Sequence, residues 1–183
     1  MHVRDCWTSR QRGIYNLSTP EIRAQVNREL EQFIVHHIDK RESFAYETTL
    51  RTKITYDQAQ RAKANGFAAV MRYVALNSVE ESIRRVRLRS EKGGHSAPPE
   101  RIREIYSASL NNLPQALRDF DRVTVYDNTE LSGDPPRLFE VVEGRVVFIE
   151  ADIPQWLERA LQGTEFEITE SLRTRAQNSS SII

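Results

Sequence analysis

The sequence has one cysteine, Cys6, in 183 residues. A single cysteine cannot form an internal disulfide, and no cysteine or histidine stands near it at the spacing of a zinc site, so disulfide scaffolds and zinc fingers are excluded. Long apolar runs are missing too, and the N-terminus lacks the apolar stretch of a signal peptide. We therefore expect a cytoplasmic protein without membrane association.

Glycines are few, and none stands where a phosphate-binding loop would need it. The seven glycines are Gly13, Gly66, Gly93, Gly94, Gly133, Gly144 and Gly163. A Walker A loop has the pattern Gly-x-x-x-x-Gly-Lys-Ser/Thr, because its backbone amides surround the phosphates and its lysine reaches the outer ones. No glycine precedes a lysine and none follows the Gly-x-Gly-x-x-Gly spacing, so these residues contain neither a Walker A loop nor a dinucleotide fingerprint.

The chain has no excess of either charge, since 26 basic residues balance 26 acidic ones. This balance argues against bulk attraction to nucleic acid or to an anionic membrane, although it leaves room for local patches. One such patch lies in the helix predicted near residues 79–92, which holds five basic residues: Arg84, Arg85, Arg87, Arg89 and Lys92.

Hydrophobic periodicity predicts alternating helices and strands. Between Thr19 and Lys40 apolar residues recur every three or four positions, which indicates a helix with one buried stripe. The segment 43–50 is rich in aromatic and β-branched residues, as a buried strand would be. The further predicted elements are a helix over 56–64, a strand over 67–76, helices over 79–92 and 99–120, a strand over 122–128, a hairpin over 138–149 and a helix over 154–161.

A strand, a helix and a strand in succession form the unit of a parallel sheet. We therefore expect an α/β fold with a mainly parallel sheet flanked by helices in three layers, followed by a C-terminal β-hairpin. The expected organisation is an N-terminal extension over 1–18, one domain over 19–162, and a flexible tail over 163–183.

Open α/β sheets bind ligands outside the carboxyl ends of their strands, so polar residues at these ends are candidates. Glu47, Thr48 and Thr49 end the first predicted strand, and Asp127 ends the third. A carboxylate with neighbouring hydroxyls could hold a polyhydroxylated or amino substrate, or position a metal-bound water. The alternative is that these residues only pack the sheet, and position alone does not decide between the two.

Arg85 and Arg89 are four residues apart and so share one face of their helix. Two guanidinium groups side by side can bind phosphate oxygens and stabilise the charge on a phosphoryl group during transfer. A solvated basic surface is the alternative, and we assign Arg84, Arg87 and Lys92 to it. The adjacent histidines of the first helix point about 100° apart, so no histidine metal site is predicted.

Four motifs occur in order along the chain. The first is Ser43-Phe-Ala-Tyr-Glu-Thr-Thr-Leu50, and the second is Arg85-Val-x-x-Arg89-x-x-x-Gly93-Gly94-His95-x-x-Pro98. The third and fourth are Ile102-Arg103-x-x-Tyr106-x-x-Ser109-x-x-Asn112-Leu113 and Val125-Tyr126-Asp127-Asn128-Thr129. With matching gaps across roughly residues 21–162, these motifs resemble those of the zeta-toxin-type kinases.

The resemblance implies a P-loop kinase fold and a kinase that uses ATP and magnesium to phosphorylate a sugar-nucleotide hydroxyl, such as that of UDP-N-acetylglucosamine. It implies that Glu47, Thr48 and Thr49 line the substrate pocket. It also implies that Arg85 and Arg89 contact the ATP phosphates and act in catalysis, with Asp127 on the nucleotide side. Toxins of this family are held inactive by a small antitoxin, so an antitoxin-like partner is expected as well.

Two features of the family have no counterpart in these residues. Its Walker A lysine and the aspartate that activates the substrate hydroxyl lie upstream of the helix matched by Thr19–Lys40, so we expect the first strand and the phosphate loop to be missing. An arginine of the family's long helix is replaced by Ile105, and Arg103 could take over its contact. Without a phosphate loop we expect no tight binding of ATP and magnesium, and negligible kinase activity.

Three interpretations stay open. The chain is a fragment of a longer reading frame, or a shortened protein that keeps the substrate half as a binding or regulatory module, or a binder of RNA or of an acidic partner through the Arg84–Lys92 helix. A missing strand would leave strand edges unpaired, so we also expect a homodimer or a partner strand that fills the gap.

Overall fold

The computed structural model describes residues 20–94, 96–130 and 132–180. The N-terminal extension expected over 1–18 and the loop residue His95 lie outside the described residues. The helices and strands, in chain order, are α2 (Pro20–Lys40), α3 (Ile54–Ala64), β1 (Val70–Ala75), α4 (Val79–Glu91), α5 (Pro99–Asp119), β2 (Arg122–Asp127), β3 (Arg137–Val142), β4 (Arg145–Ile149), α6 (Gln155–Leu161) and α7 (Glu170–Ser180). None of these helices is both long and apolar enough to cross a membrane.

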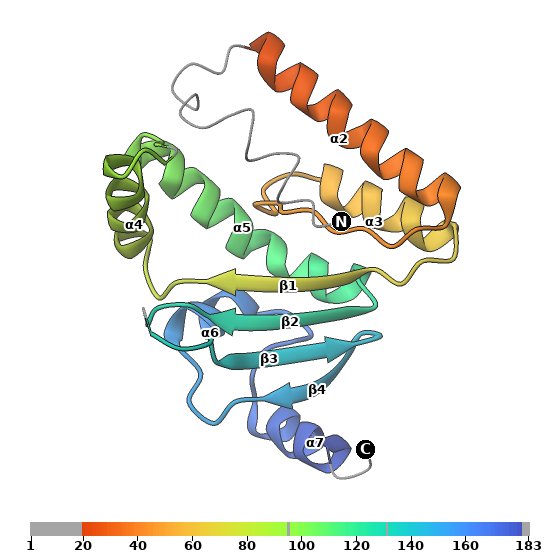
Figure 1. The fold of residues 1–183 in the computed structure, drawn as a ribbon. Coiled ribbons are helices and arrows are strands. Elements are labelled where there is room, and N and C mark those ends of the chain that lie inside the picture. The colour runs from red at the N-terminus through yellow and green to blue at the C-terminus, as the bar shows by residue number, and fades with distance from the viewer. Residues whose placement is uncertain (1–19, 95, 131, 181–183) are drawn as a thin grey trace.

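The sheet is mixed rather than mainly parallel, which corrects one expectation. Its four strands lie in the order β1-β2-β3-β4 (Figure 1). The pair β1–β2 is parallel, whereas β2–β3 and β3–β4 are antiparallel. Only β1 and β2 are joined through helices. The connections from β2 to β3 and from β3 to β4 contain no helix among the described residues, and neighbouring strands joined in this way pair antiparallel.

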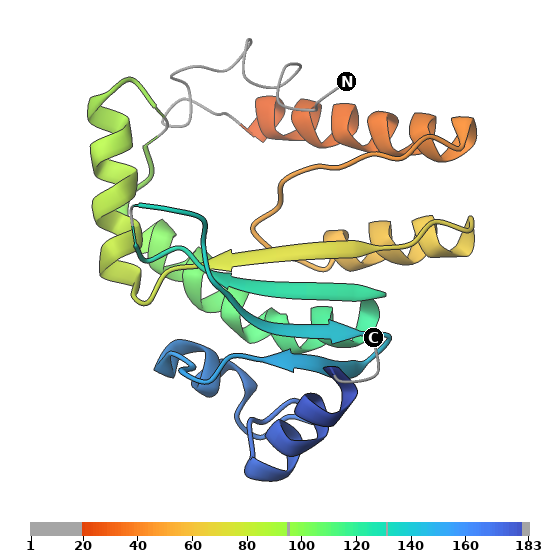
Figure 2. The ribbon, with the colours of Figure 1, turned by 60° about the horizontal axis from the view of Figure 1, so that its bottom comes forward.

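The helices do not form three layers with the sheet. Helices α5 and α6 lie on one face of the sheet, and α7 lies beside β4 on that side (Figures 1 and 2). Helices α2 and α3 lie beyond the β1 edge, so within the described residues the opposite face of the sheet carries no helix. The three-layer prediction is therefore wrong for the part of the chain that the structure describes, which has two layers.

Residues 43–50 do not form the predicted strand. They lie in an extended connection between α2 and α3. The Phe44 ring packs edge-on against Phe33, with ring centroids 6.0 Å apart, and the Tyr46 hydroxyl donates to Gln58 at 2.8 Å. The aromatic side chains of this segment pack against helices α2 and α3 instead of against a neighbouring strand.

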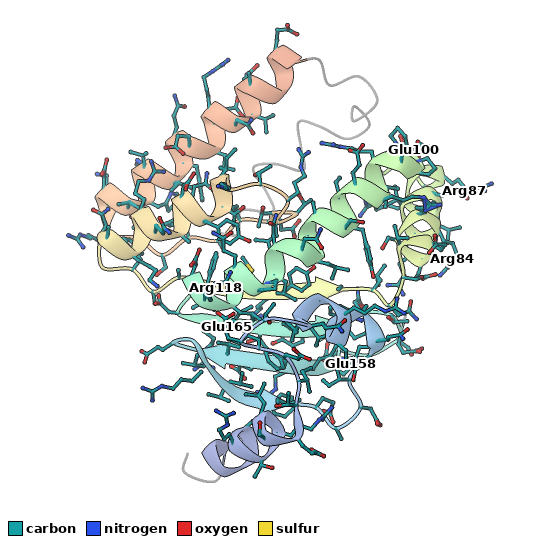
Figure 3. All side chains as sticks on the ribbon, turned by 180° about the vertical axis from the view of Figure 1, so that it is seen from behind. Arg84, Arg87, Glu100, Arg118, Glu158 and Glu165 are labelled. Carbon is teal, nitrogen blue, oxygen red and sulfur yellow. The ribbon has the colours of Figure 1, made fainter. Side chains whose placement is uncertain are left out.

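The main core lies between the sheet and α5. Val123, Val125 and Phe139 are fully buried on the strands, and Leu113 and Leu117 are fully buried on the helix. This helix has the apolar spacing that the sequence predicts, and its side chains cover the back of the sheet (Figure 3). The described part of the chain therefore has an apolar core that holds α5 against the sheet.

Residues 163–180, which belong to the predicted flexible tail, contain helix α7 and two buried apolar side chains. Phe166 is buried at 2% exposure, and Ala176 of α7 at 3%. The Arg173 guanidinium donates to the carbonyl oxygens of Glu150 at 3.0 Å and Ala151 at 3.2 Å, just after β4. The polar composition near the end of the chain does not reveal these buried apolar side chains. The predicted domain boundaries and the flexibility of the tail stay predictions.

Candidate functional site

The turns that follow β1 and β2 meet at the carboxyl edge of the sheet. The backbone N–H of Asn128 donates to the Ala75 carbonyl oxygen at 2.8 Å, and the backbone N–H of Asn77 donates to the Thr129 hydroxyl at 2.9 Å. This edge is where open α/β sheets bind ligands. The parallel pair thus places two polar turns together at this edge.

Helix α4 begins directly at this meeting point. The Ser78 hydroxyl accepts the Glu81 amide at 3.2 Å and so caps the first turn of the helix. The Ser-x-x-Glu spacing is the sequence signature of such a cap, and it could have identified Glu81 as a residue of the site. The cap fixes the direction in which α4 leaves the sheet.

Arg85 joins α4 to the turn after β2. Its Nε donates to the Glu81 carboxylate at 2.6 Å, Nη1 donates to the Asn128 carbonyl at 2.6 Å, and Nη2 donates to the Thr129 carbonyl. The side chain is 20% exposed. Because a guanidinium has five N–H donors, two remain after these three bonds. The main role of Arg85 is therefore to hold α4 against the turn after β2, and only two of its N–H groups are left to bind a ligand.

Glu81 is held in its ionised form. Hydrogen bonds from Arg84 and then from Arg85 lower the pKa of Glu81 from 4.5 to about 2. Arg84 donates to both carboxylate oxygens, at 2.6 and 2.7 Å. The carboxylate therefore anchors two basic side chains of α4, those of Arg84 and Arg85.

Asp127 holds the turn in place. Its Oδ1 accepts the Thr129 amide at 2.8 Å and also the Thr129 hydroxyl. The Tyr106 hydroxyl donates to the Leu76 carbonyl at 2.9 Å, and burial raises the pKa of Tyr106, as does the nearby Asp127 charge. In this structure one oxygen of Asp127 is occupied by the protein itself, and its predicted contact with a nucleotide stays a prediction.

A basic cavity of about 610 Å³ lies beside the C-terminal half of α4. Arg89 and Lys92 line it, and within the described residues the side chain of neither forms a hydrogen bond or an ion pair. The other lining residues are Arg84, Arg85, Leu88, Gly93 and Gly94. Sequence reasoning placed Lys92 on an ordinary surface, although its position one turn beyond Arg89 could have indicated this role.

Glycine is required at the end of α4. Gly93 has a φ of +80°, in the left-handed region. A Cβ on Gly94 would lie 2.5 Å from the Arg89 Cγ and 2.8 Å from the Arg89 carbonyl oxygen. The amides of both glycines donate to carbonyls of the last helical turn, at 3.0 and 2.9 Å. The glycines thus end the helix closely against Arg89, and their amides are not free to approach a ligand.

A second cavity, of about 540 Å³, lies across Arg84 from the first. Polar and acidic side chains line it, namely Asn77, Ser78, Glu80, Glu81, Arg84, Thr129, Glu130 and Ser132. The Glu80 carboxylate accepts a hydrogen bond from Arg103 at 3.2 Å. Arg103, which the sequence suggested as a substitute phosphate contact, is thus paired with an acid at the rim of this cavity.

The predicted substrate residues lie apart from both cavities. Glu47, Thr48 and Thr49 are exposed in the connection before α3. The Thr48 hydroxyl forms a hydrogen bond of 2.9 Å with the Thr55 hydroxyl, so it stabilises the start of that helix. No hydrogen bond or ion pair among the described residues links Glu47 or Thr49 to α4.

Phosphate fits the basic cavity by charge, because guanidinium and ammonium groups are its usual ligands. Magnesium prefers carboxylate oxygens, water and phosphate. In the described ranges no group of three or more His, Cys, Asp or Glu side chains is arranged to hold a metal ion. The described residues therefore supply ligands for an anion and no built cation site.

We expect the replacement Glu81→Gln to lower the thermal midpoint at neutral pH. A carboxylate whose pKa is depressed stabilises the fold above its ordinary pKa of 4.5, and this contribution is lost as the pH falls through about 2. The difference between wild type and variant should therefore shrink from about pH 4.5 downward in denaturation experiments. Glu91→Gln, at an exposed pair with Arg87, is the control and should change little. A difference that is independent of pH would contradict the role of Glu81.

Comparison with known proteins agrees with the order of motifs. The family model described as Zeta toxin matches residues 13–132. The match includes β1, α4, the basic cavity and the turn after β2. No curated protein and no solved structure matches the chain. Since the matched residues make up well over half of the sequence, the chain belongs to the zeta toxin family, a family of kinase-like P-loop proteins.

Proposed function

We propose that the chain binds the phosphates of a nucleotide in the basic cavity of α4, as the nucleotide half of a kinase-like protein. The observation that carries this proposal is the cavity itself, in which Arg89 and Lys92 are free of protein partners within the described residues. Two unpaired cations side by side repel one another, and an anion between them relieves this repulsion. Family membership supports ATP as that anion.

Arg85 and Arg89 have different parts in this proposal. Arg89 contacts phosphate oxygens directly, and Arg85 positions the turn at Asn128 while its two remaining N–H groups reach the same anion. The positive charges of both arginines would stabilise the negative charge on a phosphoryl group during transfer. Asp127 acts through the turn it holds. Magnesium, when bound with ATP, would neutralise phosphate charge and would depend mainly on the phosphates for its ligands.

The proposed acceptor substrate is a sugar nucleotide such as UDP-N-acetylglucosamine, bound near Glu47, Thr48 and Thr49. The connection that carries these residues returns from the far end of α2 toward the side where β1 and β2 end (Figures 1 and 2). Glu47 and Thr49 are exposed, so hydroxyl and amide groups of a sugar can reach them. The proposal places this substrate and ATP in the cytoplasm, with an antitoxin-like protein as the regulator.

Catalysis by these 183 residues alone is not part of the proposal. Phosphoryl transfer depends on a phosphate cradle, and the sequence contains no Walker A loop. The function proposed for the chain by itself is therefore nucleotide and sugar-nucleotide binding, and the second candidate is a regulatory module with the same contacts.

Replacing Arg89 by Ala should weaken the binding of pyrophosphate and of ATP about tenfold or more. The estimate follows from the loss of one charge-assisted hydrogen bond, which contributes about 1.5–3 kcal/mol. Isothermal titration calorimetry measures the change, and Lys92→Ala should behave similarly. Arg87→Ala is the matched control, because Arg87 is exposed on the same helix, pairs with Glu91 and does not line the cavity. Equal affinities for all three variants and wild type would overturn the site.

Purified chain incubated with ATP, magnesium and UDP-N-acetylglucosamine should release no ADP above the background rate. The physical reason is that no lysine-bearing phosphate loop positions the triphosphate. A coupled assay for ADP measures this directly, with an active family kinase as the positive control. Phosphorylation of any amino-sugar nucleotide by the chain alone would show that another group replaces the loop.

Replacing Glu47 by Ala should weaken the binding of UDP-N-acetylglucosamine and leave pyrophosphate binding unchanged. The carboxylate would otherwise accept hydrogen bonds from the sugar, and one such bond contributes about 1 kcal/mol, or roughly fivefold in affinity. Glu42→Ala, an exposed carboxylate nearer the end of α2, serves as the control in the same titration. The same weak affinity for wild type and Glu47→Ala would remove this residue from the substrate site.

A further inference from the structure

One face of the sheet is left uncovered by the helices that the structure describes (Figures 1 and 2). Residues directly opposite one another on paired strands point to the same face, so the strand register identifies its members. We call this surface the open face; its residues are Val70, Arg72, Val74, Arg122, Thr124, Tyr126, Arg137, Glu140, Val142, Arg145 and Phe148.

The open face is strongly basic. Its charged members are four arginines and one glutamate. Glu140 is only 5% exposed and accepts hydrogen bonds from Arg122 and Arg137, which keep 51% and 45% of their side-chain surface exposed. The side chains of Arg72 and Arg145 form no hydrogen bond or ion pair within the described residues. Positive charge therefore remains unbalanced across all four strands.

The β1 side of the open face is also apolar. Val70 is 57% exposed and Val74 is 53% exposed, the two largest values among the exposed large hydrophobic residues. They flank Arg72 on the same face of the strand. Two β-branched side chains with an arginine between them match a partner that presents both apolar and acidic groups.

Charge complementarity decides between the possible occupants. Residues 1–19 contain Arg4, Arg10 and Arg12 against the single acid Asp5, so this segment is itself basic. A second copy of the chain, face to face, would bring the same arginines against one another, and like charges at an interface are unfavourable. Both therefore fit the open face poorly.

We propose that the open face docks an amphipathic helix of another protein, with acidic residues flanking an apolar stripe. Its apolar stripe covers Val70 and Val74, and its carboxylates pair with Arg72 and Arg145. A helix is the element that covers one face of a sheet in α/β folds, and it buries an apolar stripe in doing so. This surface is separate from the basic cavity of α4, so the proposal does not depend on nucleotide binding.

A protein fits this surface better than a nucleic acid does. Proteins that bind single-stranded nucleic acid combine a positively charged groove with exposed aromatic rings on which bases stack. The Phe148 ring is covered by the Arg137 guanidinium, which lies 3.8 Å from its centroid, and Tyr126 is only partly exposed. The exposed valines add nothing to phosphate binding, whereas an apolar stripe would bury them.

The test measures the binding of a labelled synthetic helical peptide, with leucines along one stripe and glutamates beside it, to the full chain by fluorescence anisotropy. We expect Arg72→Glu/Arg145→Glu to weaken binding about tenfold or more through charge repulsion. Val70→Ser/Val74→Ser should also weaken it about tenfold, because less apolar area is buried. Arg87→Glu/Arg118→Glu is the matched control, since both arginines are exposed and lie on α4 and α5 (Figure 3), and it should leave binding within about twofold.

Circular dichroism verifies that each variant is folded, and protection of residues 70–74 from hydrogen exchange on adding the peptide provides a second measurement. Equal binding of a scrambled peptide of the same composition would overturn the proposal. The proposal would also be overturned if an RNA oligonucleotide bound more tightly than the peptide, and if its affinity fell with Arg72→Glu/Arg145→Glu but not with Val70→Ser/Val74→Ser. A dimer in sedimentation that the open-face variants dissociate would overturn it in favour of a second copy.

Discussion

Parallel pairing of β1 with β2 is the constraint on which the candidate site depends. The two strands run in register until Ala75 lies opposite Asp127, so the polar turns that follow them come out at the same edge. Two hydrogen bonds, from Asn128 to Ala75 and from Asn77 to Thr129, join these turns. Helix α4 starts from the joined turns, and so the position of every basic side chain on it follows from this pairing.

The arginines of α4 illustrate how one sequence pattern separates into two roles. Arg85 and Arg89 are one helical turn apart on the same face, yet only Arg85 reaches the carbonyls of Asn128 and Thr129. Four residues of helix advance the chain by about 6 Å, which places Arg89 beyond the turn. Arg89 therefore faces the cavity without a protein partner among the described residues, while Arg85 connects the helix to the sheet.

The two faces of the sheet differ in how their polar and charged groups are satisfied. On one face Val123, Val125 and Phe139 are buried beneath helices. On the other, Glu140 is buried beneath two arginines, which cover it in place of a helix. An arginine layer stays solvated and charged, so this face is compatible with water as well as with an acidic partner.

Local patterns were sufficient for the helices and for most of the strands. The helix predicted over 99–120 is α5 (Pro99–Asp119), and the predicted hairpin over 138–149 is β3 and β4. These elements depend on apolar periodicity, caps and turns within a few residues of each other. Segment 43–50 has the composition of a strand, but its aromatic side chains are buried by α2 and α3, and composition does not reveal which partner buries a side chain.

The sequence by itself determined the family motifs, the basic helix that ends at two glycines, and the lack of a phosphate loop. Each of these features depends only on residues that are close together in the sequence. Only the tertiary structure decided that the sheet is mixed and that the Arg85 side chain is paired, whereas the Arg89 side chain has no partner and one sheet face no helix among the described residues. The physical reason is sequence separation: Arg85 bonds to a carbonyl 43 residues away, and such a contact exists only after β1 and β2 have paired.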